Sequence, residues 1–145
     1  MDIFTAMDVS ASALTAERTR MNLISSNLAN ANSTRTAEGG PYKRKDAVFA
    51  ADPRKPSFGS TLSRISGGQP TGVQVTQIVE DQSDPRLKYD PHHPDADQSG
   101  NVALPNVNVV EEMADMITAS RAYEANVTAV QAAKAMAMKT LELGR

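Results

Sequence analysis

Cysteine and tryptophan are absent from this chain of 145 residues, and only three phenylalanines and three tyrosines occur in it. Without cysteine there can be no disulfide, no thiolate metal site and no cysteine nucleophile. Aromatic side chains usually dominate the energetics of a compact core, so their scarcity predicts that the chain is marginal as a self-sufficient globule. The length is that of one ordinary domain.

An excess of basic residues is also missing, because the formal net charge is −2 and the isoelectric point is about 5.6. Proteins that bind nucleic acids in general need a basic face that neutralises phosphates. The basic run Lys43-Arg44-Lys45 is too short to provide such a face, and we interpret it as a solvated loop or strand edge. No nucleic-acid partner is therefore expected.

Long apolar runs are missing too, since no stretch approaches the ~20 apolar residues that cross a bilayer. The first residues, Met1-Asp2-Ile3-Phe4, lack the basic segment and following apolar segment that mark a secretory signal peptide. We therefore expect a protein that does not span a membrane and that carries no cleavable secretion signal.

Motifs that carry catalytic or metal chemistry are not found, among them G-x-S-x-G, H-E-x-x-H and the Walker loop. Residues 95–100 imitate the start of an EF-hand loop, but its twelfth position is Asn106, where calcium binding needs a bidentate glutamate. His92 and His93 are adjacent, yet no further metal ligand is identifiable beside them. We expect no catalytic residue, no cofactor, no metal site and no small-molecule substrate.

The two ends of the chain, residues 2–31 and 108–143, carry apolar residues at helical spacing. In the first segment an apolar residue recurs every seven positions, at Met7, Leu14, Met21 and Leu28, which predicts an amphipathic helix with a narrow seam. In the second, Asn108 followed by acidic residues is typical of a helix start. A broad apolar face then continues to Leu141, which predicts a helix about 50 Å long at ~1.5 Å per residue.

Between these ends the chain is rich in proline, glycine, aspartate and serine. Alternating valines predict a half-buried strand over residues 72–80, with Leu62 and Ile65 as candidates for its hairpin partner, and residues 42–49 form a weaker candidate strand. Residues 81–106 are interpreted as extended and largely irregular because prolines interrupt them.

The predicted fold class is therefore mainly α with a small β or irregular insert. The long N- and C-terminal helices would pair as a coiled-coil-like hairpin, and the central region would contain a β-hairpin. In domain terms, residues 1–32 and 107–145 would form a terminal helical unit, and residues 33–106 a central extended or β region.

Three parts of the sequence resemble the flagellar axial family of rod and hook proteins. Residues 23–32 (LISSNLANAN) are similar to the family's N-terminal signature, and residues 107–126, with VNVVEEM and ITASRAYEAN, are similar to its C-terminal signature. Residues 89–108, with YDPHHPDAD and NVALPNVN, resemble the short members found in the proximal rod. The three matches in this order identify the chain as a member of the family.

The resemblance implies a structural subunit of the bacterial flagellar basal-body rod and no enzyme activity. Such subunits are exported by the flagellum-specific type III apparatus without a cleavable signal peptide. They assemble helically in the periplasm with copies of themselves and with other rod proteins. The rod so formed transmits motor torque to the hook.

Assembly is expected to involve the terminal helices, whose apolar stripes exceed what one helical hairpin can bury. An ordinary intramolecular core is the alternative reading of the same stripes. A cytosolic helical-hairpin adaptor or export chaperone would share these helices, and a hydrolase using the acidic loop would have only His92, His93 and nearby aspartates in its favour. The predicted assembly residues are Met7, Leu14, Met21, Ile24, Asn27, Leu28, Asn30, Met113, Ile117, Arg121, Tyr123, Asn126, Val127, Val130 and Leu141.

Overall fold

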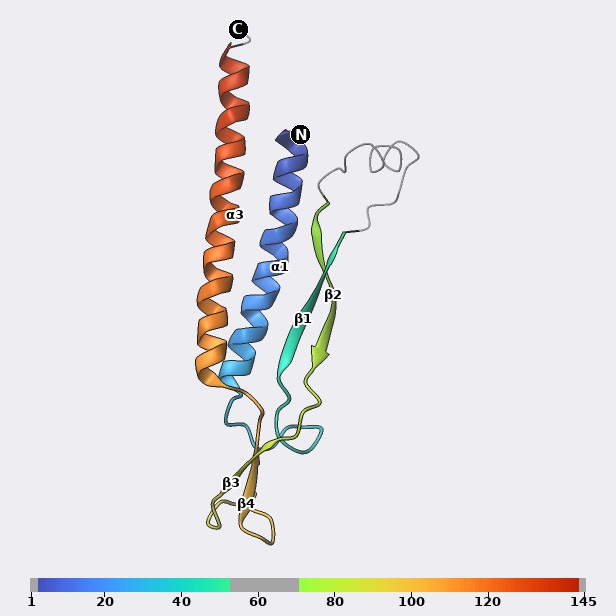
Figure 1. Ribbon diagram of the computed structural model, residues 1–145, viewed down its shortest axis with the longest axis vertical. Helices are drawn as coiled ribbons and strands as arrows, with labels where there is room; N and C mark the ends of the chain where they lie inside the picture. Colours follow the sequence, from blue (N-terminus) through green and yellow to red (C-terminus); the bar gives the residue numbers. More distant parts are fainter. Residues whose placement is uncertain (1–2, 53–70, 144–145) are drawn as a thin grey trace.

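The computed structural model describes residues 3–52 and 71–143. Within these residues, two β-hairpins lie between two long helices in sequence order (Figure 1). Helices α1 and α3 pack against each other and run antiparallel. The elements are α1 (Ile3–Ala29), β1 (Lys45–Ala51), β2 (Val73–Glu80), β3 (Arg86–Tyr89), β4 (Asn101–Leu104) and α3 (Val109–Leu143). The mainly α prediction with long terminal helices is confirmed, and both helices lie within two residues of the expected bounds.

Local sequence explains where both helices stop and start. Helix α1 ends where Asn30 donates its side-chain amide to the carbonyl of Ser26 (2.9 Å), because a short polar side chain competes for the backbone bonds that a helix needs. Helix α3 begins after Asn108, whose Oδ1 accepts a hydrogen bond from the backbone nitrogen of Val110 (3.2 Å). Two glutamates occupy the first turn of α3, where the positive end of the helix dipole favours them.

The apolar core of the described residues is thin. Its buried side chains are mostly small, among them Ala16 on α1 and Ala119 and Ala133 on α3, and Ile24 is the largest aliphatic side chain buried among the described residues. Small side chains allow two helices to approach closely but bury little apolar area each. Many larger apolar side chains stay exposed on the same helices, so the chain hides only part of its apolar surface by itself.

The first hairpin pairs β1 with β2 in antiparallel register, from Lys45 opposite Glu80 to Ala51 opposite Val73, with an irregularity after Val48. The predicted strand 72–80 is therefore confirmed. Its observed partner is residues 45–51, and the expected partner residues Leu62 and Ile65 lie outside the described part of the chain.

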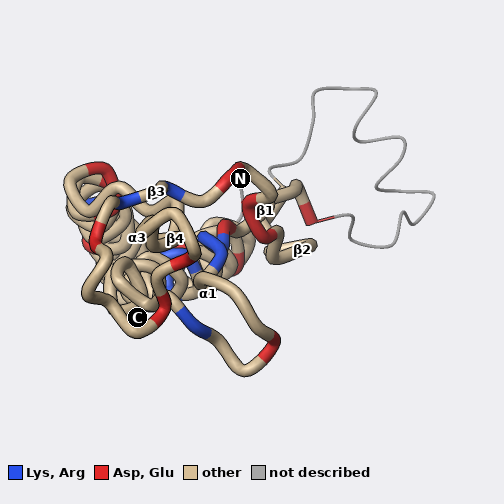
Figure 2. The backbone as a smooth tube through the Cα atoms, turned by 90° about the horizontal axis from the view of Figure 1, so that it is seen from below, with Lys and Arg blue, Asp and Glu red and all other residues tan. Residues whose placement is uncertain are grey.

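Side-chain contacts along the strands hold the first hairpin against α1. The hydroxyl of Ser12 accepts a hydrogen bond from the backbone nitrogen of Val73 (3.0 Å). The guanidinium of Arg20 lies 5.9 Å from the ring centroid of Phe49, within the range of a cation–π contact. The hairpin and α3 thus lie on opposite sides of α1, as both views show (Figures 1 and 2).

The second hairpin contradicts the expectation that residues 81–106 are largely irregular. Strand β3 pairs with β4 from Arg86 opposite Leu104 to Tyr89 opposite Asn101. The connecting turn is closed by Asp97, whose carboxylate accepts backbone hydrogen bonds from Ser99 (2.8 Å) and Asn101 (2.9 Å). Each strand has only four residues, so no alternation long enough to reveal a strand is present in the sequence.

Gly100 is a position in this turn where a side chain would be strained. Its φ is +79°, and a Cβ there would lie 2.9 Å from Cε2 of Tyr89. We expect Gly100→Ala to destabilise the β3–β4 hairpin by about 2 kcal/mol, because a left-handed backbone and a steric clash both oppose the methyl group. The measurement is urea unfolding, with the chemical shifts of Tyr89 reporting the local change.

Gly39 supplies the matched control for this prediction. Its φ is +87°, but no atom lies within 4 Å of the Cβ position. Gly39→Ala therefore adds backbone strain without a clash, and it should destabilise by only about 1 kcal/mol. Equal effects of the two substitutions would show that the contact with Tyr89 is unimportant.

Candidate assembly surface and its polar junction

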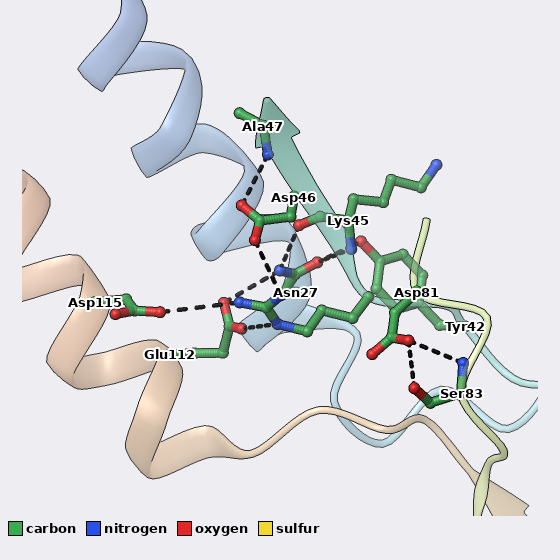
Figure 3. A network of polar contacts seen from close by, with 10 residues as sticks. Asn27, Tyr42, Lys45, Asp46, Ala47, Asp81, Ser83, Glu112 and Asp115 are labelled. Carbon is green, nitrogen blue, oxygen red and sulfur yellow. Dashed lines mark hydrogen bonds and ion pairs between the residues drawn. The ribbon is translucent and has the colours of Figure 1, made fainter. Parts of the chain in front are cut away.

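A buried polar junction fixes the end of α1 to the start of α3 and the start of β1 (Figure 3). Its centre is Asn27, which is 1% exposed. The amide nitrogen of Asn27 donates to the carbonyl of Lys45 (2.9 Å) and to Oε2 of Glu112 (3.1 Å). Its Oδ1 accepts from the backbone nitrogen of Lys45 (2.9 Å) and from the hydroxyl of Tyr42 (3.0 Å).

Glu112, also 1% exposed, is the charged member of this junction. Nε of Arg44 donates to Oε1 of Glu112 at 2.6 Å, and the same guanidinium lies 3.3 Å from the carboxylate of Asp46 and 3.9 Å from that of Asp115. A buried carboxylate is tolerated only when it is paired and hydrogen-bonded. Glu112 meets this condition through Arg44 and Asn27.

These contacts change the titration of Arg44. Partial burial would lower the pKa of its guanidinium, but the hydrogen bond and the charge of Glu112, with a smaller contribution from Asp46, outweigh burial and raise the pKa above its ordinary value. Next to the junction, hydrogen bonds from the hydroxyl and backbone nitrogen of Ser83 hold the pKa of Asp81 below its ordinary value. Arg44 therefore remains charged at any physiological pH.

The interpretation of Lys43-Arg44-Lys45 as merely a solvated segment is wrong for Arg44. The two flanking lysines do behave as surface residues: Lys43 Nζ donates to Gln82 (3.1 Å) and Lys45 Nζ lies 3.3 Å from Glu80. Arg44 instead pairs with Glu112, which is 68 positions away in the sequence, and so completes the junction. The sequence contains no local signal for so distant a pairing.

The predicted assembly residues divide into three groups by exposure. Two are buried inside the monomer and take part in its own packing, namely Ile24 and Asn27. Nine are half-buried, and we refer to them as the rim: Met7, Leu14, Met21, Leu28, Asn30, Tyr123, Asn126, Val127 and Val130. Four are exposed on α3: Met113, Ile117, Arg121 and Leu141.

Asn30 has a local structural role in addition to its place at the rim. Its side chain bonds to Ser26 and accepts a hydrogen bond from the hydroxyl of Ser33 (3.1 Å), which shapes the loop after α1. Asn30 therefore helps to end α1, whereas Asn27 bonds to β1 and α3.

Helix α3 presents an apolar stripe on the face directed away from α1. Val110, Met113 and Ile117, exposed by 75%, 50% and 56%, follow the spacing of one helix face. Glu112 and Ala119, the buried residues nearby, occupy the opposite face, which contacts α1. Sequence reasoning included Met113 and Ile117 but missed Val110, because it assigned α3 a single broad apolar face.

The last turns of α3 carry further exposed apolar side chains that sequence reasoning did not single out. They are Met136, Met138 and Leu143, which accompany the predicted Leu141. In Figure 1, α3 continues past the start of α1, so this end of the helix has no helical neighbour within the described part of the chain. Exposed apolar residues gathered on one element are typical of protein–protein contact surfaces.

Several other features of the described residues bear on function. Arg121 and Glu124, three positions apart on α3, form no ion pair with each other there. Nδ1 of His93 accepts a hydrogen bond from the backbone nitrogen of Asp95 (3.1 Å), and residues 3–52 and 71–143 contain no cluster of potential metal ligands. Neither described helix combines the length and apolarity needed to cross a membrane.

Comparison with known proteins identifies the family. A family model described as "Flagella basal body rod protein" matches residues 7–35, and one described as "Flagellar basal body rod FlgEFG protein C-terminal" matches residues 98–143. Flagellar basal-body rod protein FlgC of Bacillus subtilis (strain 168) is 47% identical over the full length of both chains. The FlgC proteins of Borreliella burgdorferi (44%, covering 99% of this chain and 98% of its own) and Escherichia coli O157:H7 (39%, the full length of both) are also similar.

The chain belongs to the FlgC family of flagellar basal-body rod proteins. The resemblance inferred from residues 23–32, 89–108 and 107–126 is thus confirmed, and the chain is a structural subunit of the flagellar basal-body rod. The two segments that match the rod family models contain Asn27 and Glu112. The polar junction of this FlgC-family chain therefore joins the two segments that the rod family models match.

Proposed function

We propose that this chain is a subunit of the proximal rod and polymerises helically through its terminal helices to form part of the shaft that transmits torque. The observation that carries the proposal is the apolar stripe of α3, which faces away from α1 and has no partner in the described monomer. A shaft needs resistance to twisting, and long helices packed side by side supply it. The half-buried rim of α1 and α3 would complete the contact surface.

In this proposal the chain has two working parts. Residues 1–32 and 107–145 form the axial unit, in which α1 and α3 pair in a coiled-coil-like way and bind neighbouring subunits. Residues 33–106 form the central region, whose β1–β2 hairpin packs along α1 and whose β3–β4 hairpin lies beyond the junction (Figure 1). The junction of Asn27, Arg44 and Glu112 would keep the two parts in a fixed relative position.

The partners that follow from this arrangement are copies of this chain and other rod proteins, met in the periplasmic space. The chain would reach that space through the flagellar type III export apparatus. A thin core supports this route, since export in an unfolded state is easier for a chain whose monomer is only marginally stable.

Assembly would also increase the order of the helix ends. Burying one Met, Ile or Leu side chain contributes on the order of 1.5–3 kcal/mol, and fixing the backbone of one residue costs about 1–2 kcal/mol. By these figures, a few exposed apolar residues per copy offset the cost of ordering about one turn of helix at about 3.6 residues per turn. The turns concerned are the ends of α1 and α3 remote from the junction, with Phe4, Leu141 and Leu143 exposed.

Amide hydrogen exchange should reveal this difference. In the purified monomer we expect protection near Asn27 and Glu112 and rapid exchange at the first turns of α1 and the last turns of α3. In isolated basal bodies the same amides should be protected. Full protection of residues 5–30 and 110–140 in the monomer would refute ordering on assembly.

The proposal itself is tested by deletion and by imaging. Deleting the gene should abolish swimming and prevent filaments from forming, because every part distal to a missing rod segment lacks its base. A density map of isolated basal bodies should show the chain within the shaft. Deleted cells that swim with intact filaments would contradict the proposal.

A further inference from the structure

Glu17 carries a buried polar atom that plays no part in the junction or in the contacts with the first hairpin. Its Oε2 is shielded from solvent and accepts no hydrogen bond from the described residues. Such an atom is unusual, because nearly all buried polar atoms in folded proteins have a hydrogen-bond partner. A carboxylate that loses contact with water without gaining a partner opposes the arrangement that buries it.

Helix geometry places Glu17 on the face of α1 that packs against α3. Ala13 and Ile24, one turn before it and two turns after it, follow the same stripe, and Ile24 is buried. The first hairpin meets α1 on another side, where Ser12 and Thr19 face β2. The carboxylate of Glu17 therefore lies at the seam between the two long helices.

The junction shows which part of α3 lies opposite Glu17. Asn27 of α1 is hydrogen-bonded to Glu112 of α3, and the two helices run antiparallel (Figure 1). At about 1.5 Å per residue, Glu17 lies ~15 Å from this bond along the helix axis, about level with residue 122 of α3. The inner face of α3 in this stretch is uncharged and consists of Ala119, Tyr123 and Asn126.

Strong donors on both helices near this level are engaged elsewhere or exposed. The side-chain amide of Asn126 donates to a carbonyl one turn back in its own helix (2.9 Å). Arg20, one turn after Glu17 on α1, has its guanidinium 5.9 Å from the ring centroid of Phe49 and is thus turned toward the first hairpin. Arg121 of α3 is exposed. The positive charges of this region therefore do not compensate the buried oxygen of Glu17.

The helix pair thus has a secured end and a weak point. At the junction, the buried carboxylate of Glu112 is paired with Arg44 and bonded to Asn27. Oε2 of Glu17 has no such partner among the described residues, and separating the helices returns this carboxylate to water. The cost of dehydrating Glu17 is present only while the pair is closed, so it shifts the balance toward the open pair.

We infer that Glu17 keeps the α1–α3 pair ready to open from its free end down to the level of Glu17, while the junction stays closed. The segments that separate are residues 3–16 of α1 and residues 123–143 of α3, which include most of the rim. The use of this opening rests on the proposed function: an open pair makes the apolar rim residues accessible to neighbouring subunits before the rod buries them.

Hydrogen exchange of purified monomers, followed by mass spectrometry, tests the weak point. Glu17→Met replaces the carboxylate by an apolar side chain of similar length and similar helix propensity. We expect the exchange of residues 5–16 and 123–140 to slow by about tenfold, because the closed pair no longer holds an unsatisfied carboxylate oxygen.

Two further variants separate the carboxylate from other effects of the substitution. Arg18→Met adds the same side chain at the next position, which is exposed, and should leave exchange unchanged. Glu17→Asp keeps a carboxylate at the seam and should exchange at least as fast as the unaltered chain. Equal slowing by Glu17→Met and Arg18→Met, or no slowing by either, would overturn the inference.

Swimming shows whether the rod uses this opening. Cells with Glu17→Met should swim less than cells with Glu17→Asp, and their isolated basal bodies should contain less of the chain. Equal swimming of the two, with slowed exchange in Glu17→Met, would overturn the inferred use in assembly. Absence of the unaltered chain from basal bodies would overturn the proposed function, whereas the exchange of the monomers would still decide whether Glu17 is a weak point.

Discussion

Replacing Asn27 by alanine is expected to lower the free energy of unfolding by about 3–4 kcal/mol, one of the largest effects available in this chain. The substitution removes four hydrogen bonds at once. It leaves the backbone groups of Lys45 and Oε2 of Glu112 without the partner that satisfied them. Each buried polar group left unsatisfied costs about 1–3 kcal/mol, partly offset by the better helix propensity of alanine.

Urea unfolding followed by circular dichroism measures this effect. For a small protein the loss should move the unfolding midpoint by about 1 M or more. Asn22→Ala is the matched control, because Asn22 is on the same helix but exposed. The control should be neutral or slightly stabilising, and similar midpoints for the two variants would show that the junction does not hold the fold.

The helices were predictable because their signal is local and repeated. Seven-residue spacing from Met7 to Leu28, and an asparagine with two acids at the start of α3, fix the type and the approximate bounds of each helix. Strand β2 was predictable for the same reason, because Val73 and Val75 alternate with polar residues. Each of these elements can be recognised from the pattern of apolar residues within a window of about ten residues.

The second hairpin and the junction were not predictable in this way. Strand β3 (Arg86–Tyr89) is exposed along its whole length and takes its order from pairing with β4 and from the turn closed by Asp97. Arg44 meets Glu112 only after the chain has folded back across both hairpins. Features that depend on contacts distant in sequence leave no periodic trace in it.

The direction of each apolar stripe was only partly predictable. Periodicity shows that α3 has apolar faces, but not which one α1 covers. The structure assigns the inner face to Glu112 and Ala119 and leaves Met113 and Ile117 outside. The distinction between core and assembly surface therefore comes from the packing of α1, which the periodicity of α3 alone does not contain.

Ile117→Asp is expected to abolish swimming while leaving the isolated monomer nearly unchanged. Ile117 is 56% exposed, so the monomer should lose no more than about 0.5 kcal/mol of stability. In an assembled rod the same position would be buried, and an unpaired carboxylate in an apolar contact costs several kcal/mol at every copy. Because the penalty is repeated at each subunit, the rod should fail to form.

Swimming on soft agar and the amount of the chain in isolated basal bodies measure this result, and thermal unfolding of the purified variant checks the monomer. Ile78→Asp is the matched control, since Ile78 is 50% exposed but lies on β2, outside the terminal helices. If assembly depends on the helices, only the α3 variant stops swimming, because the same new charge on the hairpin remains in solvent. Swimming by both variants would mean that the outer face of α3 stays exposed in the rod, and the apolar stripe would then need another explanation.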